Sequence, residues 1–229
     1  KDVVFRDLGL LVLDEEQRFG VKHKERLKAL RETVDVLTLT ATPIPRTLHM
    51  SMTGVRDISV ISTPPEDRHP IITYVCAFED AIVAEAIRKE LARGGQIYFV
   101  HNNIHGIDAM AARLKELVPE VQLEVAHGRM GEEELESVMF RFLARKLDML
   151  VCTTIIESGL DVPAANTILV NRADRFGLAQ MYQLRGRVGR AGEQAYAYLF
   201  IPEESTLTRN AQKRLKVLME YSDLGSGFQ

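Results

Sequence analysis

The sequence predicts an α/β fold in which helices flank both faces of a parallel sheet. Short apolar runs of strand length alternate along the chain with amphipathic stretches of helical length. The apolar runs are continuous rather than alternating with polar residues, which is typical of strands that helices bury on both faces. The repetition of strand, helix and strand implies right-handed crossover connections and an open parallel sheet.

The predicted strands and helices follow from these patterns. The strands are Leu8–Leu13, Val36–Thr40, Ile71–Cys76, Gln96–Val100, Val121–Ala126, Met149–Cys152, Thr167–Val170 and Ala195–Ile201. The helices between them are Asp80–Arg93, Ile104–Val118, Glu132–Arg145 and Leu178–Arg187. The first of these helices gathers its apolar side chains on one face and ends at Gly94-Gly95, a common helix stop.

Composition limits the classes of protein to which the chain can belong. The 229 residues are 46% hydrophobic, which is enough for one large domain or two lobes with their own cores. A net charge of −3 creates no basic field, so any DNA contact must come from local patches. The apolar runs are shorter than the roughly 20 residues of a membrane span, and no signal peptide is recognisable. Cys76 and Cys152 lie in apolar strand-like runs, which indicates a reduced, cytoplasmic protein.

A proline-rich stretch divides the chain. Residues Ser62–Pro70 contain three prolines and several charged residues, with neither helical nor strand periodicity. Because proline fixes φ and biases the preceding residue toward extended geometry, we interpret the stretch as a linker between two domains. An ordinary long surface loop is the alternative.

Carboxylates directly follow the first predicted strand. Leu10–Leu13 leads into Asp14, Glu15 and Glu16, and we expect these side chains at the carboxyl edge of the sheet, where open α/β folds bind ligands. Asp14 can hold a Mg²⁺ ion that bridges nucleotide phosphates, and Glu15 can orient or deprotonate an attacking water. Acidic residues also end strands for solubility, and a metal-dependent nuclease would use the same carboxylates.

Three further polar segments carry candidate site residues. Thr40–Leu48 and Val151–Asp161 each come directly off a predicted strand. Gln183–Arg190 holds three arginines within six residues, and two glycines interrupt the helix there. Arginines so close together repel one another, and no core or capping requirement explains them, whereas guanidinium groups that face phosphate do. The last segment therefore indicates a site for a polyanion.

Together these segments resemble a known family. Asp14–Gln17, Thr40–Thr42, Thr153–Asp161 and Gln183–Arg190 are similar, in this order and spacing, to motifs II, III, V and VI of the superfamily 2 helicases. The resemblance covers essentially the whole chain.

A closer resemblance is to one branch of that superfamily. Arg18–Val21 and Thr40–Leu48 look like the branch that holds RecG and the bacterial transcription-repair coupling factors. Glu15-Glu16, the Asp35–Leu39 approach to motif III and Phe176–Gln180 favour the coupling factors. A RecG-type helicase that remodels forks and branched DNA is the alternative.

The resemblance implies a RecA-like fold and a division of the chain. It predicts a remnant of a first RecA-like lobe over residues 1–62, the linker over 63–70, a complete second lobe over 71–205 and the start of a helical translocation module over 206–229. In such a motor ATP and Mg²⁺ bind between the lobes, and hydrolysis drives stepping along double-stranded DNA. For the coupling factors the implied partners include stalled RNA polymerase and the nucleotide excision repair proteins.

The resemblance also implies roles for individual residues. Asp14 would organise the Mg²⁺ ion and Glu15 the hydrolytic water, with Glu16 and Gln17 at the nucleotide. The family usually has histidine where Gln17 stands, and glutamine keeps the hydrogen-bonding reach but cannot carry a proton charge. The other implied roles are nucleotide contact for Gly159 and Asp161, coordination of the site for Gln183, arginine fingers for Arg187 and Arg190, coupling for Thr40 and Thr42, and nucleic-acid contact for Thr153, Asn102 and Asn103.

One part of such a motor does not occur in this sequence. The Walker A loop contains a Gly-Lys dipeptide that the chain lacks, and related motors place that loop before motif II. We therefore expect the chain to be part of a motor, inactive by itself as an ATPase and at most a non-catalytic nucleotide- or DNA-binding module. Leu8–Leu13 and Val36–Thr40 would then leave open strand edges, which favours a non-native dimer through the first lobe.

Overall fold

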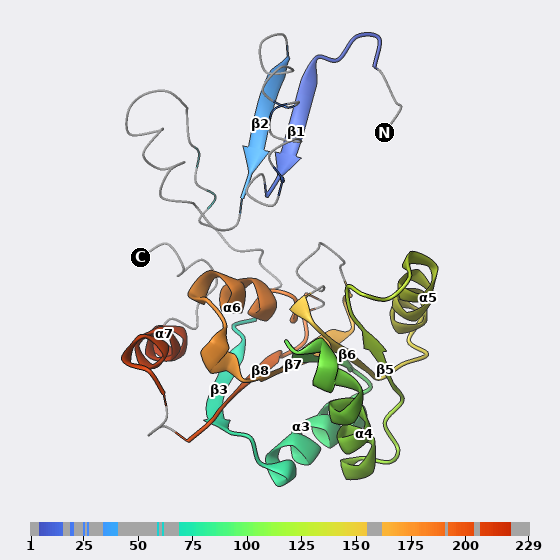
Figure 1. Cartoon of the computed structure of the whole chain (residues 1–229), viewed down its shortest axis with the longest axis vertical. Helices are drawn as coiled ribbons and strands as arrows, with labels where there is room; N and C mark the ends of the chain where they lie inside the picture. The colour runs from blue at the N-terminus through green and yellow to red at the C-terminus, as the bar shows by residue number, and fades with distance from the viewer. Residues whose placement is uncertain are drawn as a thin grey trace. The chain divides into compact units, whose positions relative to one another are not determined.

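The chain forms two compact units, Lys1–Ile61 and Ser62–Gln229 (Figure 1). The computed structural model describes residues 5–15, 19–20, 25, 27, 34–40, 59, 61, 69–154, 162–190, 192–203 and 207–220. Within these residues, none of the helices combines the length and the apolar character that a membrane span requires. The proline-rich stretch lies mostly outside the described residues.

The described part of the first unit contains a pair of parallel strands, β1 (Leu10–Asp14) and β2 (Asp35–Leu39). Both strands were predicted from the sequence, but in this chain they are not buried on both faces. Leu10, Val12 and Leu37 are each at least half exposed, whereas Leu13 is buried. Side chains alternate between the two faces of a strand, so the pattern means that only one face of this pair is packed.

The described part of the second unit is a six-stranded parallel sheet with helices on both faces. Its strands are β3 (Ile72–Ala77), β4 (Gln96–His101), β5 (Leu123–Ala126), β6 (Met149–Cys152), β7 (Ala165–Asn171) and β8 (Tyr196–Ile201). Its helices are α3 (Asp80–Ala92), η2 (Ile104–Gly106), α4 (Ile107–Leu117), α5 (Glu132–Leu143), η4 (Ala173–Arg175), α6 (Leu178–Arg185) and α7 (Arg209–Glu220). The strand order is β3-β8-β7-β4-β6-β5, and every pair is parallel.

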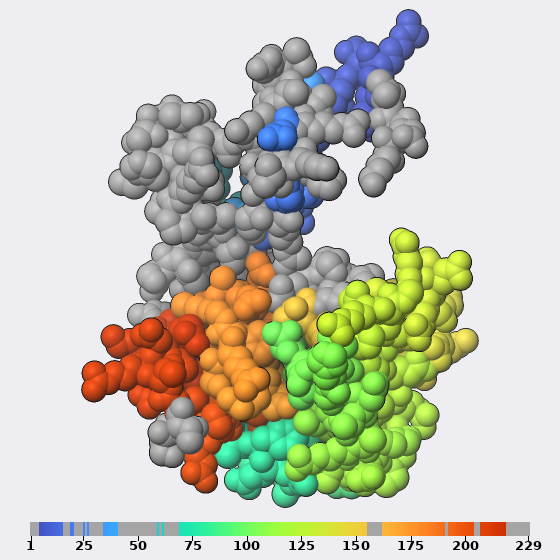
Figure 2. Space-filling view, viewed as in Figure 1, coloured from blue at the N-terminus to red at the C-terminus, as the bar shows by residue number. Residues whose placement is uncertain are grey.

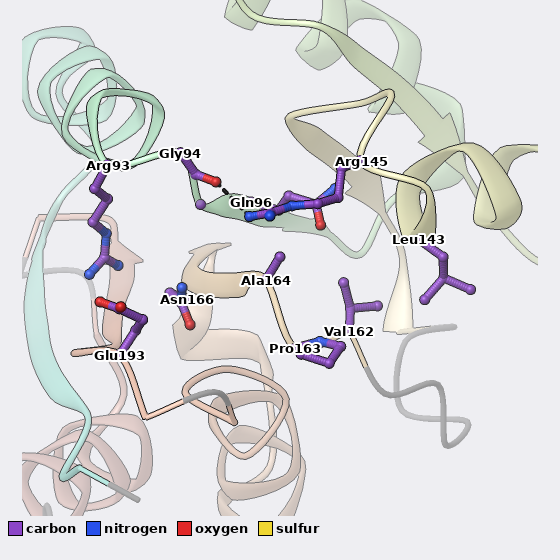
Figure 3. A pocket seen from close by; sticks show the side chains of 11 residues that line it. Arg93, Gly94, Gln96, Leu143, Arg145, Val162, Pro163, Ala164, Asn166 and Glu193 are labelled. Atoms are coloured by element: carbon purple, nitrogen blue, oxygen red, sulfur yellow. Dashed lines mark hydrogen bonds between the residues drawn. The ribbon is translucent and has the colours of Figure 1, made fainter. Parts of the chain in front are cut away.

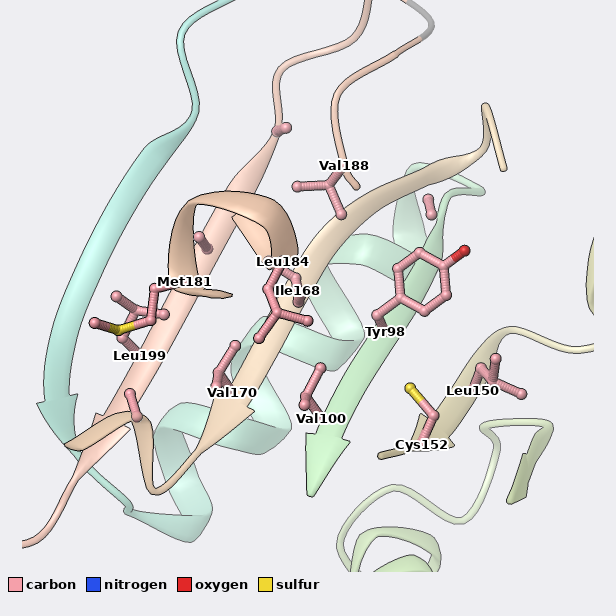
Figure 4. Packing of buried hydrophobic residues seen from close by; sticks show 14 of the residues in the cluster. Tyr98, Val100, Leu150, Cys152, Ile168, Val170, Met181, Leu184, Val188 and Leu199 are labelled. Carbon is pink, nitrogen blue, oxygen red and sulfur yellow. The ribbon is translucent and has the colours of Figure 1, made fainter. Parts of the chain in front are cut away.

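Two hydrophobic clusters lie on opposite faces of this sheet. The cluster around Val83, Ile87 and Leu114 joins α3 and α4 to one face. The other cluster joins α5, α6 and α7 to the opposite face. Figure 4 shows the part of it that lies between α6 and the strands. Strands β4, β6 and β7 lie between the two layers and are buried along almost their whole length. For these central strands the prediction of burial on both faces is confirmed.

The edge strand β3 departs from that prediction. Ile72 and Tyr74 are about two-fifths exposed, because they lie on the face that α3 covers only in part. The Tyr74 ring stacks on the Tyr198 ring of β8, with 5.0 Å between ring centroids. Edge position, rather than a lack of apolar character, therefore sets the burial of this strand.

Candidate functional site

In the first unit, the predicted carboxylates follow β1 directly. Asp14 is the last residue of the strand and is exposed. Glu15 comes next in a left-handed conformation with φ 51°, which is uncommon for a residue other than glycine. Its backbone N–H donates to the Leu39 carbonyl at 2.9 Å, and the Thr40 hydroxyl donates to Glu15 Oε1 at 3.4 Å. The structure thus brings Glu15 and Thr40, two of the predicted residues, into contact.

The residues at this edge fit a Mg²⁺ ion that nucleotide phosphates hold jointly with the protein. Asp14 and Glu15 supply carboxylate oxygens, which hard cations prefer. Among the described residues, no group of three or more His, Cys, Asp or Glu side chains could hold a metal ion by itself. Mg²⁺ in nucleotide sites typically uses one or two carboxylates and takes its other ligands from phosphates and water. The predicted site residues Glu16, Gln17 and Thr42 lie outside the described residues.

In the second unit, the arginine-rich segment is anchored by its apolar residues. Leu184 and Val188 are fully buried against the sheet (Figure 4). Arg187 is half-buried and Arg190 is exposed, so the two predicted arginine fingers lie on the outer side of the segment. Gln183 is half-buried on α6.

A glycine sets the turn that carries these arginines. Gly189 has φ 74°, and its backbone N–H donates to the Ala165 carbonyl at 3.3 Å. A Cβ atom at this position would stand 2.7 Å from the Cβ of Ala195, a separation that real Cβ atoms do not adopt. Because Ala165 begins β7, this contact puts Arg190 at the amino end of the parallel strands. The predicted nucleotide contacts Gly159 and Asp161 lie outside the described residues.

The predicted nucleic-acid residues lie at the opposite, carboxyl end of the strands. Asn102 and Asn103 follow β4 and are exposed, and Asn103 Oδ1 accepts from the His105 backbone N–H at 3.2 Å. Thr153 follows the adjacent strand β6 but is only 8% exposed. The structure therefore brings these three residues to one edge and separates them from Arg190.

The same edge holds two contacts that were not predicted from the sequence. His101 Nδ1 and Asn171 Nδ2 are 2.9 Å apart at the ends of β4 and β7, and burial lowers the pKa of His101. Arg172, left-handed at φ 55°, donates twice to the Asp174 carboxylate at 2.9 Å. These hydrogen bonds from Arg172 hold the pKa of Asp174 below its usual range. No sequence pattern identifies the residues after β7 as part of a site. Polar residues follow an apolar run there, and the same pattern occurs in most loops that follow a strand.

A cavity of about 410 Å³ lies at the amino ends of β4 and β7 (Figure 3). Arg145 extends over Gln96 and donates to the Gly94 carbonyl at 2.8 Å, and Arg93 and Glu193 point toward each other. None of the described residues that were predicted as site residues lines this cavity. Its size alone does not make it a functional site.

Comparison with known proteins defines the class of the second unit. Residues 80–192 match the family model for the helicase conserved C-terminal domain. The structure of RecG bound to a three-way DNA junction is similar, with TM-score 0.75 and 37% identity over 99% of this chain and 30% of that chain. Saccharomyces cerevisiae Dbp5 bound to RNA and ADP BeF3 has TM-score 0.66 at 16% identity, over 93% of this chain and 57% of that chain, which shows the fold alone. The second unit is therefore a RecA-like helicase C-terminal lobe.

Sequence identity over the whole chain narrows this class. The chain is 59% identical over 227 residues to the transcription-repair-coupling factor of Myxococcus xanthus, and 58% identical over 229 residues to that of Bacillus subtilis. These matches cover 99% and 100% of the chain. The chain belongs to the transcription-repair-coupling factor family of superfamily 2 helicases. It spans about one fifth of the length of these relatives, 19% and 20% respectively.

Proposed function

We propose that the chain is part of an ATP-dependent motor that moves along double-stranded DNA and couples transcription to repair at stalled RNA polymerase. The observation that carries this proposal is the identity of 54–59% to coupling factors over 99–100% of the chain. A RecG-type activity on branched DNA is the second candidate, because the RecG likeness also extends over 99% of the chain. Its identity is lower, at 37%, which favours the coupling factor.

The nucleotide chemistry in this proposal uses residues of both units. Bound with ATP, Mg²⁺ would neutralise phosphate charge, and Asp14 would hold it together with the phosphates. Glu15, whose backbone bonds Leu39 and whose carboxylate accepts from Thr40, would orient the attacking water. Arg187 and Arg190 would stabilise the charge that develops on the transferred phosphoryl group.

The DNA contacts in this proposal lie at the carboxyl edge of the second sheet. Asn102 and Asn103 are exposed there and can donate to phosphate oxygens. Because phosphate contacts position a protein without reading bases, Asn102→Ala and Thr153→Ala should weaken duplex binding equally for all sequences. Binding of a panel of duplexes measures this, and a loss confined to some sequences would contradict the assignment. Thr153→Ala needs a thermal melt alongside, since that residue is buried.

The test of the nucleotide site is made in the complete gene product that carries this chain. Arg187→Ala and Arg190→Ala should each lower DNA-stimulated ATP turnover by roughly 10³ to 10⁵, the contribution of arginine fingers in related phosphoryl transfer. Arg88→Ala is the matched control, because Arg88 is exposed on α3 and pairs with Glu120. Near-normal turnover in both finger variants would show that the segment has another role.

Glu15→Gln gives an independent check on the first unit. This variant keeps the size and hydrogen-bonding reach of Glu15 but cannot act as a base, so it should bind ATP and stall before hydrolysis. Rapid filtration should then recover intact ATP on the protein. Turnover at the normal rate would remove Glu15 from the mechanism.

The 229-residue chain by itself should hydrolyse no ATP above background. A Walker A loop supplies backbone donors and a lysine to the phosphates, and no segment of this sequence replaces them. Vigorous DNA-stimulated turnover by the chain alone would contradict this proposal.

Two assays of the complete gene product separate the two candidate functions. Release of a stalled RNA polymerase supports the coupling factor, and reversal of a branched DNA junction without such release supports the RecG type.

A further inference from the structure

The loop that carries Asn102 and Asn103 folds back on the residue before it. The Asn103 backbone N–H donates to the His101 carbonyl at 2.9 Å, and the Gly106 N–H donates to the Asn103 carbonyl at 3.2 Å. Asn103 Oδ1 accepts from the backbone N–H of His105 at 3.2 Å. All three bonds join residues of the loop to one another, so they shape the loop but do not fasten it to a neighbouring strand.

The His101 side chain fastens this loop to β7. Asn171 Nδ2 donates to His101 Nδ1 at 2.9 Å, and these two residues are paired at the ends of β4 and β7. Asn171 is only 9% exposed. In Figure 2 the green surface that follows β4 meets the orange surface that follows β7. Because an amide nitrogen only donates, Nδ1 accepts and the proton of the neutral ring lies on Nε2.

The other ring nitrogen lies against Gly106, the residue before α4. A Cβ atom on Gly106 would stand 3.3 Å from His101 Nε2, which is closer than most Cβ atoms approach a neighbour. The imidazole therefore has a bonded partner on one side and a close backbone neighbour on the other. It has little room to turn away from Asn171 while the loop keeps this conformation.

The stability of the sheet does not depend on this bond. Strands β4 and β7 are buried along almost their whole length and are paired through their backbones. One neutral hydrogen bond adds little net stability to such a structure. Its larger effect is geometric, because it fixes the direction in which the chain leaves β4, and the exposed amides of Asn102 and Asn103 come next.

We infer that His101 is a positioning residue for the proposed DNA contacts of Asn102 and Asn103. The bond from Asn171 holds the loop in the conformation that presents both amides to the phosphates, so less freedom is lost when duplex DNA binds. The inference rests on the proposed function of this loop. It assigns His101 itself no contact with DNA.

The test uses five variants of the complete gene product. His101→Leu and Asn171→Leu each remove one partner, and a third variant carries both substitutions. His101→Gln keeps an acceptor, and Gly106→Ala displaces the ring while both partners stay in place. The matched control is His105→Leu, because the His105 side chain is exposed and makes no hydrogen bond within the described residues. Thermal melting and titration with a DNA duplex are measured for each.

His101→Leu and Asn171→Leu should each bind the duplex about fivefold more weakly, the cost of ordering one long side chain again on binding. The variant with both substitutions should bind no more weakly than the weaker single variant, since the two residues act through one bond. His101→Gln should regain most of the affinity, and His105→Leu should bind like the unsubstituted protein.

The decisive measurement repeats His101→Leu in a protein that already carries Asn102→Ala and Asn103→Ala. There the substitution should leave duplex binding unchanged, because the amides that it positions are gone. It should still lower the melting temperature as it does with both asparagines present. A purely structural role would instead weaken binding by the same factor in both backgrounds.

Two results would overturn the inference. One is normal duplex binding by folded His101→Leu, and the other is an equal loss of binding in the two backgrounds. If His101→Leu does not fold, Gly106→Ala decides by the same comparison. Normal duplex binding with alanine at both Asn102 and Asn103 would overturn the proposed DNA contacts themselves, so the two failures are distinguishable.

Discussion

Replacing Glu90 should destabilise the second unit strongly. Glu90 is 1% exposed near the end of α3 and accepts a hydrogen bond from the Thr167 hydroxyl of β7 at 2.5 Å. It also pairs with Arg93, whose Nε donates to the same carboxylate at 3.0 Å. Arg93 in turn donates to the Gln194 carbonyl, just before β8, at 2.5 Å. The buried carboxylate thus joins α3 to β7, and its partner Arg93 joins the end of α3 to the segment before β8.

The magnitude follows from the burial of the two partners. Removing one member of a buried ion pair costs about 3–5 kcal/mol, because the other charge stays buried without compensation. The Arg93 side chain is 25% exposed and regains some hydration, so Glu90→Ala should fall near the lower limit, about 3 kcal/mol. For a chain of this size that loss lowers the melting temperature by roughly 6–12 °C. Thermal melting followed by circular dichroism measures it.

Glu120→Ala is the matched control. Glu120 also pairs with an arginine, Arg88, but both side chains are 54% exposed. Exposed ion pairs contribute little to stability, so this variant should melt close to the unsubstituted chain. If Glu90→Ala and Glu120→Ala lowered the melting temperature equally, burial would not be what gives the Glu90 pair its importance.

Gly95 offers a second test of the same carboxylate. A Cβ atom on Gly95 would stand 1.6 Å from Glu90 Oε1, so Gly95→Ala forces the carboxylate out of its position. The destabilisation should be large in the unsubstituted chain and small in the Glu90→Ala background, since the obstacle is then absent. Contacting residues show such non-additivity, whereas independent sites do not. Additive losses in this double-mutant cycle would refute the reasoning.

Three further predictions concern other parts of the second unit. Cys152 is fully buried and burial raises the pKa of its thiol, so iodoacetamide should modify it only after unfolding. Cys76 is half-buried and should react slowly in the folded chain. Mass spectrometry at successive times after iodoacetamide is added distinguishes the two cysteines. Arg145 has φ 57°, so Arg145→Gly should be about 1 kcal/mol more stable to urea than Arg145→Ala, and equal stability would show no strain there. Because Arg172 lowers the pKa of Asp174, the stability from this contact should be complete above about pH 4 and be lost as the pH falls through the lowered pKa. Asp174→Asn should remove that part of the pH dependence, which urea unfolding at pH 3 and pH 7 measures.

Most of the described secondary structure could be predicted from the sequence, because continuous apolar runs determine where central strands lie. The prediction for Met149–Cys152 matches β6 at both ends. The prediction for Thr167–Val170 is too short, since β7 extends over Ala165–Asn171. There the apolar run ends at polar side chains, but the backbone remains paired with β4 as far as His101 opposite Asn171. Backbone pairing has no signature in side-chain polarity, so strand ends are where the prediction is inexact.

Contacts between distant residues could not be predicted in the same way. A glutamate is almost never fully buried unless it is paired, and Glu90 is buried because Thr167, 77 residues later, and Arg93 both donate to it. Arg185 belongs to an arginine-rich segment that reads as one anion site, yet it contacts Leu218, 33 residues later. In both cases the deciding partner comes from another element. Whether a charged helix residue is buried depends on the elements that pack against the helix, and the local sequence does not specify them.

The arrangement of strands in the second unit separates the two groups of proposed functional residues. Arg190 lies at the amino end of β7, through the bond from Gly189 to Ala165, whereas Asn102 follows the carboxyl end of the adjacent strand β4. At about 3.3 Å per residue, the seven residues of β7 place these ends on the order of 20 Å apart. The strands between them are buried on both faces and paired on both sides, so they resist local deformation. Displacement of the arginines would therefore reach the proposed DNA contacts mainly by rotation of the whole lobe. A strand-bound sheet transmits such rotation to both ends together.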